Sequence, residues 1–458
     1  MASQMTEPEI QSALARVEQS LGEERPMDAI PDLQAILAAV PNHPGALCGI
    51  GRVSIQLGDN NAALHALNLA LDQVPEMLEA RNARGVAYQN LDRLTEAEAD
   101  FQFVCDRLPD NPGALLNMGG LLAARGEFPA AEQYFERILS IAPDNPTAGY
   151  NLGLLHLVTG RLAEGWRGFD LRSRADNVGL APGRSRQPGW SGENRPQGTL
   201  LIQAEQGLGD NIQFIRYAAL ARARVGRVIV EAPDPLTDLF SGIAGVDDVV
   251  ARGHPLPPHD AQISVMSLPR VFETKIDTVP WDGAYIRPAP ERVAYWRNRL
   301  GAGGQARHVG LVWAGNPGHK RDSQRSVALS VLAPLFDVEG VVFHSLQIGP
   351  AAAQMDAVPF GRRIRPLFRK ARPFKEVAAT VSALDLVIGV DTSLVHLAGA
   401  MARPVWTMVT RVPDWRWMLD RSDTPWYPTM RLFRQPAAGD WNGVAGEVAT
   451  ALREFVDN

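Results

Sequence analysis

The chain has 458 residues, of which 45% are hydrophobic and 21% charged, and its formal net charge is −6. At roughly 100 to 200 residues per domain, this length predicts about three domains with buried cores. Residues 1–170 contain 11 arginines, no lysine and 23 acidic residues, a net charge of −12, so the rest of the chain carries +6. Nucleic acid is therefore not expected as a partner, and the basic remainder is the better place for an anionic small molecule.

The first residues, MASQMTEPEIQSALARVEQS, are polar and acidic, and no window reaches the roughly 18 apolar residues of a membrane helix. We expect a cytoplasmic chain without membrane insertion. Cys48 and Cys105 lie far apart in sequence, which predicts two core thiols rather than a disulfide or a thiolate metal site.

The first third repeats with a period of 34 residues. Three ladders share this step: Pro41, Pro75, Pro109 and Pro143; Gly51, Gly85, Gly119 and Gly153; and Ala29, Ala63, Ala97 and Ala131. Small residues suit closely crossing helices, and proline stops the second helix of each pair. The pattern resembles the tetratricopeptide repeat, an all-α superhelix of helix pairs. A helical bundle with chance spacing is the alternative.

In such arrays the first helices line the concave face. Carried over by repeat position, the predicted acceptor groove contains Asn82, Val86, Gln89, Leu116, Tyr150 and Leu154. This set is neutral or apolar, which favours an extended or helical protein segment as partner. The alternative is a groove that packs only against the rest of the chain. We assign residues 1–172 to the array, with a capping helix around Trp166 and Phe169, and the Gly-, Pro-, Ser- and Arg-rich residues 173–198 to a linker.

From Thr199 onward, short β-branched runs alternate with helical stretches. The strand-length runs are TLLIQAE, RVIVEA, AQISVMS, HVGLVWA, VVFHSLQ, LDLVIGV and PVWTMV. This alternation predicts two Rossmann-like α/β domains, residues 199–296 and 297–458, with a cleft between them. Ligands of such folds bind beyond the carboxyl ends of the strands.

The loop after the first run, in LIQAEQGLGDNIQF, contains Gly207 and Gly209 and places Asp210 at a predicted helix N-cap. Glycines permit close approach of backbone to a substrate, and a helix N-terminus favours a negative group. The spacing lacks the three glycines of the dinucleotide fingerprint, so no nicotinamide cofactor is expected. An ordinary turn with a capping aspartate is the alternative.

Two later loops carry donor-side candidates. WAGN, with Asn316, leads to the cations Lys320, Arg321 and Arg325, which suit a diphosphate, although a solvated basic loop has the same composition. Gln347 ends the run VVFHSLQ. After LDLVIG, the residues Asp391, Thr392, Ser393 and His396 open a helix whose N–H groups can hold phosphate, with a capped helix and a core histidine as the alternative.

GLGD, WAGN with its basic loop, and GVDTSLVHLAGA together resemble the heptosyltransferase-type glycosyltransferases of GT-B fold, and the run VPDWRWMLDRSDTPWYPTMRLFRQ resembles bacterial proteins that fuse tetratricopeptide repeats to such a domain. The order of repeats and GT-B unit is also similar to that of O-linked N-acetylglucosamine transferases. The resemblance implies that Asp210 is the general base and that Lys320, Asp391 and Thr392 bind donor phosphate and sugar. It also implies an inverting reaction without a metal or cofactor.

The sequence thus predicts a glycosyltransferase that moves a sugar from a nucleotide sugar to a hydroxyl, on a protein recruited by the repeats, such as flagellin or another surface protein. A non-catalytic scaffold or nucleotide sensor, and a nucleotide-sugar epimerase or hydrolase, are the alternatives.

Two features of the sequence each allow two interpretations. The basic run from Arg362 to Arg372 is a solvated face or a site for an acidic donor. Trp415, Arg416, Trp417, Trp426 and Tyr427 stack on a ligand or pack in the core.

Overall fold

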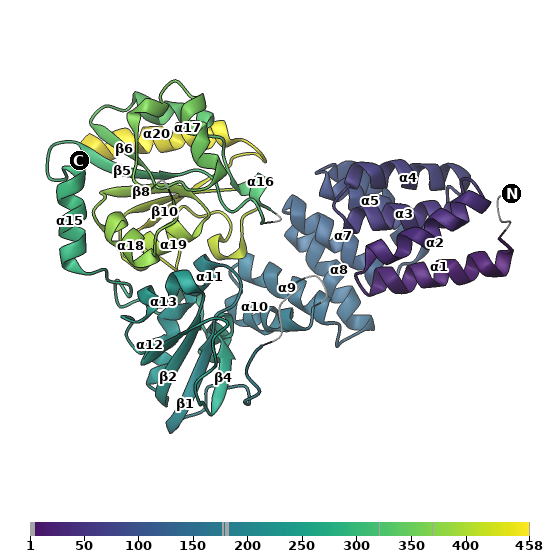
Figure 1. Cartoon of the computed structure of the whole chain (residues 1–458), viewed down its shortest axis with the longest axis horizontal. Helices are drawn as coiled ribbons and strands as arrows, with labels where there is room; N and C mark the ends of the chain where they lie inside the picture. Colours follow the sequence, from purple (N-terminus) through teal and green to yellow (C-terminus); the bar gives the residue numbers. More distant parts are fainter. Residues whose placement is uncertain (1–4, 176–177, 179–182, 320, 369, 458) are drawn as a thin grey trace. The chain divides into compact units, whose positions relative to one another are not determined.

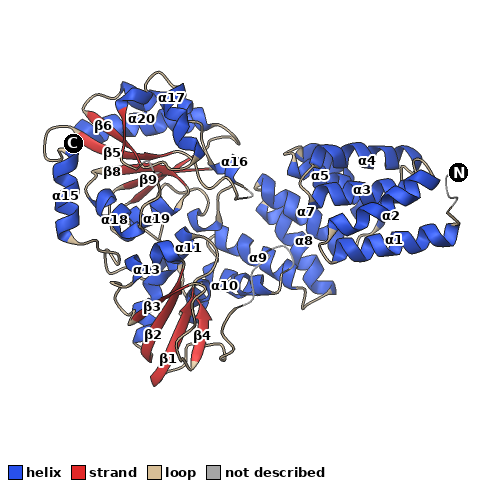
Figure 2. Cartoon of the chain, viewed as in Figure 1, coloured by secondary structure: helices blue, strands red, loops and turns tan. Residues whose placement is uncertain are grey.

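The computed structural model describes residues 5–175, 178, 183–319, 321–368 and 370–457. The chain divides into two compact units, Met1–Leu152 and Gly153–Asn458. The first unit is helical and the second contains two parallel sheets (Figures 1 and 2). The predicted fold class, a helical repeat array followed by an α/β region, is confirmed. The domain boundaries proposed from the sequence remain predictions.

The helical repeats run through ten helices in pairs. Their bounds are α1 (Glu7–Gly22), α2 (Pro26–Ala39), α3 (Pro44–Gln56), α4 (Asn60–Gln73), α5 (Leu78–Asn90), α6 (Leu94–Arg107), α7 (Pro112–Arg125), α8 (Phe128–Ile141), α9 (Pro146–Val158) and α10 (Leu162–Phe169). Each proline of the 34-residue ladder lies two residues after the end of an even-numbered helix. This position fits a residue that cannot continue the i to i−4 hydrogen bonding.

The repeat glycines mark where paired helices touch. A Cβ on Gly51, Gly85 or Gly119 would lie 2.4, 2.4 or 2.7 Å from a side-chain atom of Leu67, Phe101 or Phe135, respectively. A larger residue at any of these positions would force the facing side chain, or the helix that carries it, to shift. The predicted reason for the glycine ladder is therefore confirmed.

The first sheet has four parallel strands in the order β3-β2-β1-β4. They are β1 (Arg195–Gln203), β2 (Val225–Ala232), β3 (Asp248–Ala251) and β4 (Ala261–Ser264), joined by α11 (Leu208–Phe214), α12 (Ala218–Arg222) and α13 (Asp234–Phe240), and followed by α14 (Leu268–Val271) and α15 (Pro290–Leu300). The parallel pairing brings the carboxyl ends of β1 and β4 to one edge.

The second sheet has six parallel strands in the order β10-β9-β8-β5-β6-β7. They are β5 (Arg307–Val312), β6 (Val341–Ser345), β7 (Ile364–Pro366), β8 (Leu386–Val390), β9 (Val405–Val409) and β10 (Met430–Arg434). The α-helices of this part are α16 (Asp322–Arg325), α17 (Gln354–Ala357), α18 (Phe374–Ser382), α19 (Ser393–Ala400) and α20 (Trp441–Asp457). Figure 1 shows α18 and α19 on one face of the sheet and α17 and α20 on the other.

Short 3₁₀ helices complete the second unit: η1 (Asp170–Ser173), η2 (Ile215–Tyr217), η3 (Val265–Ser267), η4 (Ile276–Thr278), η5 (Leu329–Asp337), η6 (Pro350–Ala353), η7 (Gly361–Arg363) and η8 (Trp415–Trp417). All seven strand-length runs of the sequence coincide with strands. β3, β7 and β10 were not predicted.

The predicted capping helix α10 packs into the core of the second unit. Trp166 donates its indole N–H to the carbonyl of Thr274, 2.9 Å away. Its ring makes edge contacts with Phe214 at 6.3 Å, Trp415 at 5.4 Å and Trp426 at 6.1 Å between centroids. Aromatic pairs at these spacings add to the stabilisation from burial. α10 is therefore part of the core of the second unit.

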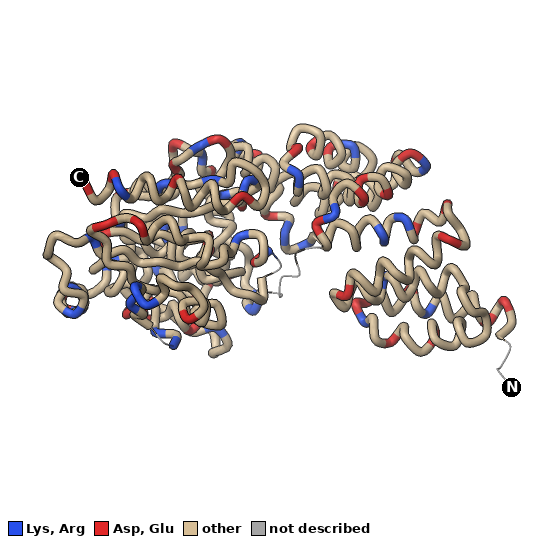
Figure 3. The backbone as a smooth tube through the Cα atoms, turned by 90° about the horizontal axis from the view of Figure 1, so that it is seen from above, with Lys and Arg blue, Asp and Glu red and all other residues tan. Residues whose placement is uncertain are grey.

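Charged residues are spread along the chain in Figure 3, with acidic and basic positions interspersed. Within the part of the chain that the structure describes, no helix combines the length and the apolar character needed to cross a membrane.

Candidate active site

Asp210 lies in the first turn of α11, just beyond the carboxyl end of β1. The helix begins at Leu208 with Gly207 as its N-cap, so Asp210 occupies the third helical position. Its Oδ2 accepts a hydrogen bond of 2.8 Å from the backbone N–H of Gly207. The prediction of Asp210 as the N-cap was wrong, because the helix starts earlier and the carboxylate reaches back to the cap in a capping-box arrangement.

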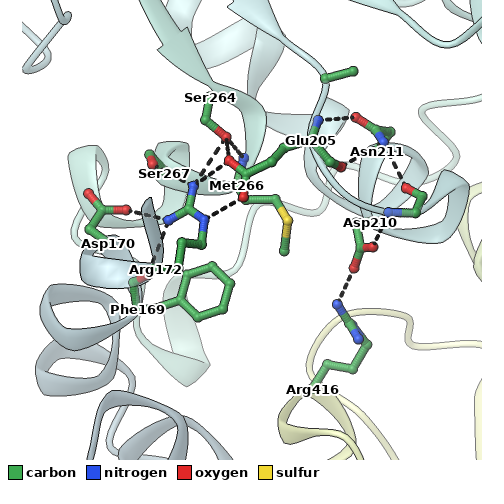
Figure 4. A network of polar contacts seen from close by, with 12 residues as sticks. Phe169, Asp170, Arg172, Glu205, Asp210, Asn211, Ser264, Met266, Ser267 and Arg416 are labelled. Carbon is green, nitrogen blue, oxygen red and sulfur yellow. Dashed lines mark hydrogen bonds and ion pairs between the residues drawn. The ribbon is translucent and has the colours of Figure 1, made fainter. Parts of the chain in front are cut away.

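Hydrogen bonds and an ion pair of Asn211 and Glu205 fix the loop before α11. The Asn211 side chain donates to the carbonyl oxygens of Glu205 and Gly207, at 2.9 and 2.7 Å. Arg172, which is buried in η1, donates to both carboxylate oxygens of Glu205, at 2.5 and 2.8 Å (Figure 4). A bidentate guanidinium–carboxylate pair fixes the geometry of both partners. The segment after the repeats thus supports the Asp210 loop.

The Asp391 motif opens α19 at the carboxyl end of β8, as predicted. Thr392 is the N-cap and Ser393 the first helical residue. The Thr392 hydroxyl is buried and has no hydrogen-bond partner among the described residues. His396 is buried, with Nδ1 3.0 Å from the Tyr427 hydroxyl and its ring stacked on Trp417. Its Nε2 lies 3.6 Å from Oδ1 of Asp391.

The starts of α11 and α19 are in direct contact. A Cβ on Gly209 would lie 2.8 Å from Cδ2 of His396. Gly209 was predicted to let backbone approach a substrate, whereas in this structure it lets two helix N-termini approach each other. The predicted cleft is therefore closed at this point by helix contact.

Arg416 joins the two sheets through a cluster of carboxylates. Its Nη2 donates to Oδ1 of Asp210 at 2.5 Å, and its Nη1 lies 2.7 Å from Oδ1 of Asp414. Its Nε donates to the Gln213 side chain at 2.8 Å. Figure 4 shows the Arg416 guanidinium pointing at Asp210 from the facing loop. We call Asp210, Asp391, Asp414 and Arg416 the aspartate cluster.

The pKa values of Asp391 and Asp414 are shifted in opposite directions. Burial alone would raise the pKa of Asp391, but the proximity and charge of His396 and the charge of Arg416 lower it. Burial raises the pKa of Asp414; Arg416 opposes that shift, while Asp391 and Asp210 add to it. Burial alone would lower the pKa of Arg416, but Asp414, Asp210 and Asp391 raise it. Carboxylates whose pKa values are shifted in opposite directions are typical of acid–base sites.

The basic loop after β5 is partly engaged within the chain. Arg321 donates to the carbonyl of Val412 at 3.3 Å, and Arg325 pairs with Asp322 at 3.2 Å. Asn316 is exposed, and its Oδ1 accepts from the N–H of Gly318 at 3.0 Å. Lys320 lies outside the described residues. Arg321 and Asn316 remain available at the surface, whereas Arg325 is committed to its neighbour.

Gln347 has a structural role in this structure. Its side-chain oxygen accepts from the N–H groups of Trp313 and Ala314, and its nitrogen donates to the carbonyls of Ala314 and Ile348. All four contacts are to backbone, at 2.9 to 3.1 Å. Gln347 ties the ends of β5 and β6 together, and its predicted contact with the donor remains a prediction.

The aromatic run between β9 and β10 resolves in favour of core packing. Trp415, Trp417, Trp426 and Tyr427 are all buried. The residues of this run whose side chains could take part in a reaction are Asp414 and Arg416. Sequence reasoning did not select Asp414, because Asp210 and Asp391, the carboxylates that raise its pKa, lie far from it in the chain.

The basic run is split by the fold. Arg362 and Arg363 lie on η7 and Arg365 on β7, all exposed, while Arg369 is outside the described residues. Arg372 lines a cavity of about 520 Å³ together with Arg292, Tyr295, Trp296, Arg299, Leu367, Pro373 and Glu376. This cavity lies between α15 and the start of α18. It contains none of the aspartate cluster.

The predicted groove residues Asn82, Val86, Gln89, Leu116, Tyr150 and Leu154 lie on α5, α7 and α9 and are half-buried. Asn117 donates its side-chain N–H to Oδ1 of Asn82 at 2.7 Å, so amides of successive repeats meet on the first helices.

Comparisons with known proteins match the N-terminal region and the C-terminal region to two different families. Residues 13–77, 48–112, 82–146 and 116–165 match the tetratricopeptide repeat model, and residues 372–424 match glycosyltransferase family 9 (heptosyltransferase). Protein FlbA of Caulobacter vibrioides is 26% identical over 465 aligned positions, covering 94% of this chain and 70% of FlbA.

Two solved structures resemble the repeats. A thermophilic tetratricopeptide protein of Thermus thermophilus is 24% identical over 36% of this chain and 96% of its own, with a TM-score of 0.33. PilF of Pseudomonas aeruginosa is 17% identical over 37% of this chain and 78% of its own, with a TM-score of 0.33. The chain carries tetratricopeptide repeats in its N-terminal region, and a segment of its C-terminal region matches the heptosyltransferase family model.

Proposed function

We propose that this chain transfers a sugar from a nucleotide-sugar donor to a hydroxyl of a protein recruited by the repeats. One observation carries the proposal. The segment that matches glycosyltransferase family 9 contains Asp391, Thr392 and Arg416, and these residues meet the start of α11 at the carboxyl ends of two parallel sheets. Ligands of α/β sheets bind at this edge.

The proposed donor site is the start of α19. The backbone N–H groups of Ser393 and Leu394 and the Thr392 hydroxyl, which have no partner among the described residues, suit phosphate oxygens. Arg416 is close enough to this helix start for its charge to lower the pKa of Asp391, and Arg321 lies on the basic loop that contacts Val412. Preorganised donors of this kind offset the charge that develops on a leaving phosphate. We propose a metal-independent GT-B reaction, with no cofactor.

In the proposed reaction, the acceptor oxygen forms a bond to the anomeric carbon while the bond from that carbon to the donor phosphate breaks. Attack opposite the leaving phosphate inverts the anomeric centre. The leaving phosphate takes the bonding electron pair, and a carboxylate takes the proton of the acceptor hydroxyl. The aspartate cluster supplies candidates for this base, of which the sequence favours Asp210.

The protein acceptor is proposed from the repeats. Their first helices present neutral and apolar side chains, with paired amides at Asn82 and Asn117 that can hydrogen-bond to the backbone of an extended segment. Flagellin or another surface protein is the proposed acceptor class.

Nucleotide binding tests the donor site. We expect one nucleotide of a panel of UDP, GDP, ADP and CMP compounds to raise the melting temperature, because a ligand at about 100 times its Kd adds roughly 2.7 kcal/mol of stability. Asp391→Ala should abolish the shift, while Asp356→Ala, at an exposed position of α17, should keep it. No shift from any nucleotide would favour the non-catalytic scaffold instead.

A further inference from the structure

The three carboxylates around Arg416 differ in how many of their oxygens are engaged. Asp210 uses both: Oδ1 accepts from Arg416 and Oδ2 from the N–H of Gly207. Its side chain is 15% exposed. Each oxygen of Asp210 already accepts one hydrogen bond, so an acceptor hydroxyl would have to share an oxygen with Arg416 or with the Gly207 N–H.

Asp414 is arranged differently. Its Oδ1 accepts from the backbone N–H of Arg416 at 3.1 Å and lies 2.7 Å from Nη1 of Arg416 in an ion pair. No contact to its Oδ2 occurs among the described residues, and its side chain is 36% exposed, the largest fraction in the cluster. The contacts to Oδ1 therefore fix the orientation of the Asp414 carboxylate, while its Oδ2 is open to an incoming group.

The surroundings of Asp414 also suit a proton acceptor. The charged groups that face it are Arg416 on its own 3₁₀ helix, Asp210 on α11 and Asp391 before α19. Partial burial, which leaves 36% of the side chain exposed, and the two neighbouring carboxylates raise the pKa of Asp414 above its usual value, and a raised pKa makes a carboxylate a stronger base. The side chain of Asp391, which is 17% exposed, has its pKa lowered instead.

We propose that Asp414, through its unengaged Oδ2, takes the proton of the acceptor hydroxyl, and that Asp210 is a positioning residue that holds Arg416. This assignment rests on the proposed glycosyl transfer. In the step, the hydroxyl proton moves to Oδ2 as the acceptor oxygen bonds to the anomeric carbon, and the electron pair of the broken bond leaves with the phosphate. Arg416 stays charged and keeps the Asp414 carboxylate oriented.

A chemical probe tests the geometry without a substrate. Carbodiimide with glycine ethyl ester amidates accessible carboxyl groups, and peptide mass spectrometry reads each site in the full-length native chain. We expect Asp414 to be modified several-fold faster than Asp210 and Asp391. Equal or faster modification of Asp210 would overturn the assignment of the open oxygen to Asp414.

Kinetics test the role, using whichever of UDP-N-acetylglucosamine, UDP-glucose, GDP-mannose, ADP-glucose and CMP-N-acetylneuraminate the wild-type chain consumes. General-base catalysis is worth about 10²- to 10⁴-fold, so Asp414→Asn should lower kcat by about that factor and leave KM for the donor unchanged. The acid limb of the pH–rate profile should disappear in Asp414→Asn, and formate should restore turnover to Asp414→Ala. Asp423→Asn, an exposed change in the same segment, should behave as wild type.

The outcomes separate the two proposals. If the wild-type chain turns over a donor and Asp414→Asn keeps both its rate and its acid limb, the role of Asp414 is overturned and the proposed transfer stands. The same holds if formate rescues Asp210→Ala but not Asp414→Ala. If the wild-type chain consumes none of the donors, the proposed transfer fails and the role of Asp414 fails with it.

Discussion

A buried pair of histidines makes the second sheet sensitive to acid. His308 on β5 and His344 on β6 are stacked with ring centroids 5.2 Å apart, and Nδ1 of His308 lies 2.9 Å from Nε2 of His344. Burial, together with the neighbouring His308 and Arg365, lowers the pKa of His344 to about 4. His344 therefore stays neutral in the folded chain under conditions that protonate an ordinary histidine.

This pair predicts a pH-dependent stability. The pKa of a histidine in an unfolded chain is about 6.5. On acidification, His344 therefore binds a proton in the unfolded chain at a higher pH than in the folded chain. This difference in proton binding has no effect on stability above about pH 6.5. It lowers the free energy of unfolding by up to about 3 kcal/mol as the pH falls to about 4. Urea unfolding followed by tryptophan fluorescence measures it, because all ten tryptophans lie in the second unit. His344→Gln should flatten this slope, and an unchanged slope would contradict the assignment.

Individual site residues could be predicted where a short motif carries them. Asp391, Thr392 and Ser393 follow a strand directly, so the sequence alone assigns them to a helix start, and the structure agrees. Arg416 could not be recognised as the partner of Asp210, because a hydrogen bond across 206 positions leaves no local pattern. Gly209 shows the same limit, since its close contact is with His396 on another element.

Among the helices, α7 contains two neighbouring glycines, of which one lies against another helix and the other does not. A Cβ on Gly119 would lie 2.7 Å from the Phe135 ring, whereas a Cβ on Gly120 would meet nothing within 4 Å. Gly119 therefore serves the contact between α7 and α8. Gly120 serves no contact of this kind.

The two positions give a matched test. Gly119→Ala should destabilise the helix pair by about 1 to 3 kcal/mol through overpacking. Gly120→Ala should stabilise it by about 0.5 to 1 kcal/mol, because alanine loses less backbone entropy than glycine in a helix. Hydrogen exchange of peptides from α7 and α8 reads the effect locally. Similar changes in both variants would mean that the repeat glycines are not packing residues.

Predicting the elements from sequence succeeded where periodicity or apolar length is strong. The glycine and alanine ladders fall on the eight helices from α2 to α9, and seven apolar runs coincide with strands. The strands that escaped prediction, β3, β7 and β10, are all edge strands. An edge strand has one neighbour and needs less apolar sequence, and β7 lies within a basic run.

The whole chain combines two kinds of surface in one polypeptide. Its acidic first third presents neutral side chains on the first helices of the repeats, and its second unit brings carboxylates and an arginine to the edges of two parallel sheets. This combination predicts an enzyme whose reaction with a small donor depends on a protein acceptor.

The most direct test of that claim is consumption of nucleotide sugars by the purified full-length chain, measured as released nucleoside phosphate, with and without purified flagellin. The proposal predicts that one nucleotide sugar is consumed, that EDTA leaves the rate unchanged, that Asp391→Ala abolishes it, and that flagellin gains the mass of the sugar. Equal release with and without protein, and no sugar on the protein, would identify a hydrolase. No release from any nucleotide sugar would contradict the proposed transferase.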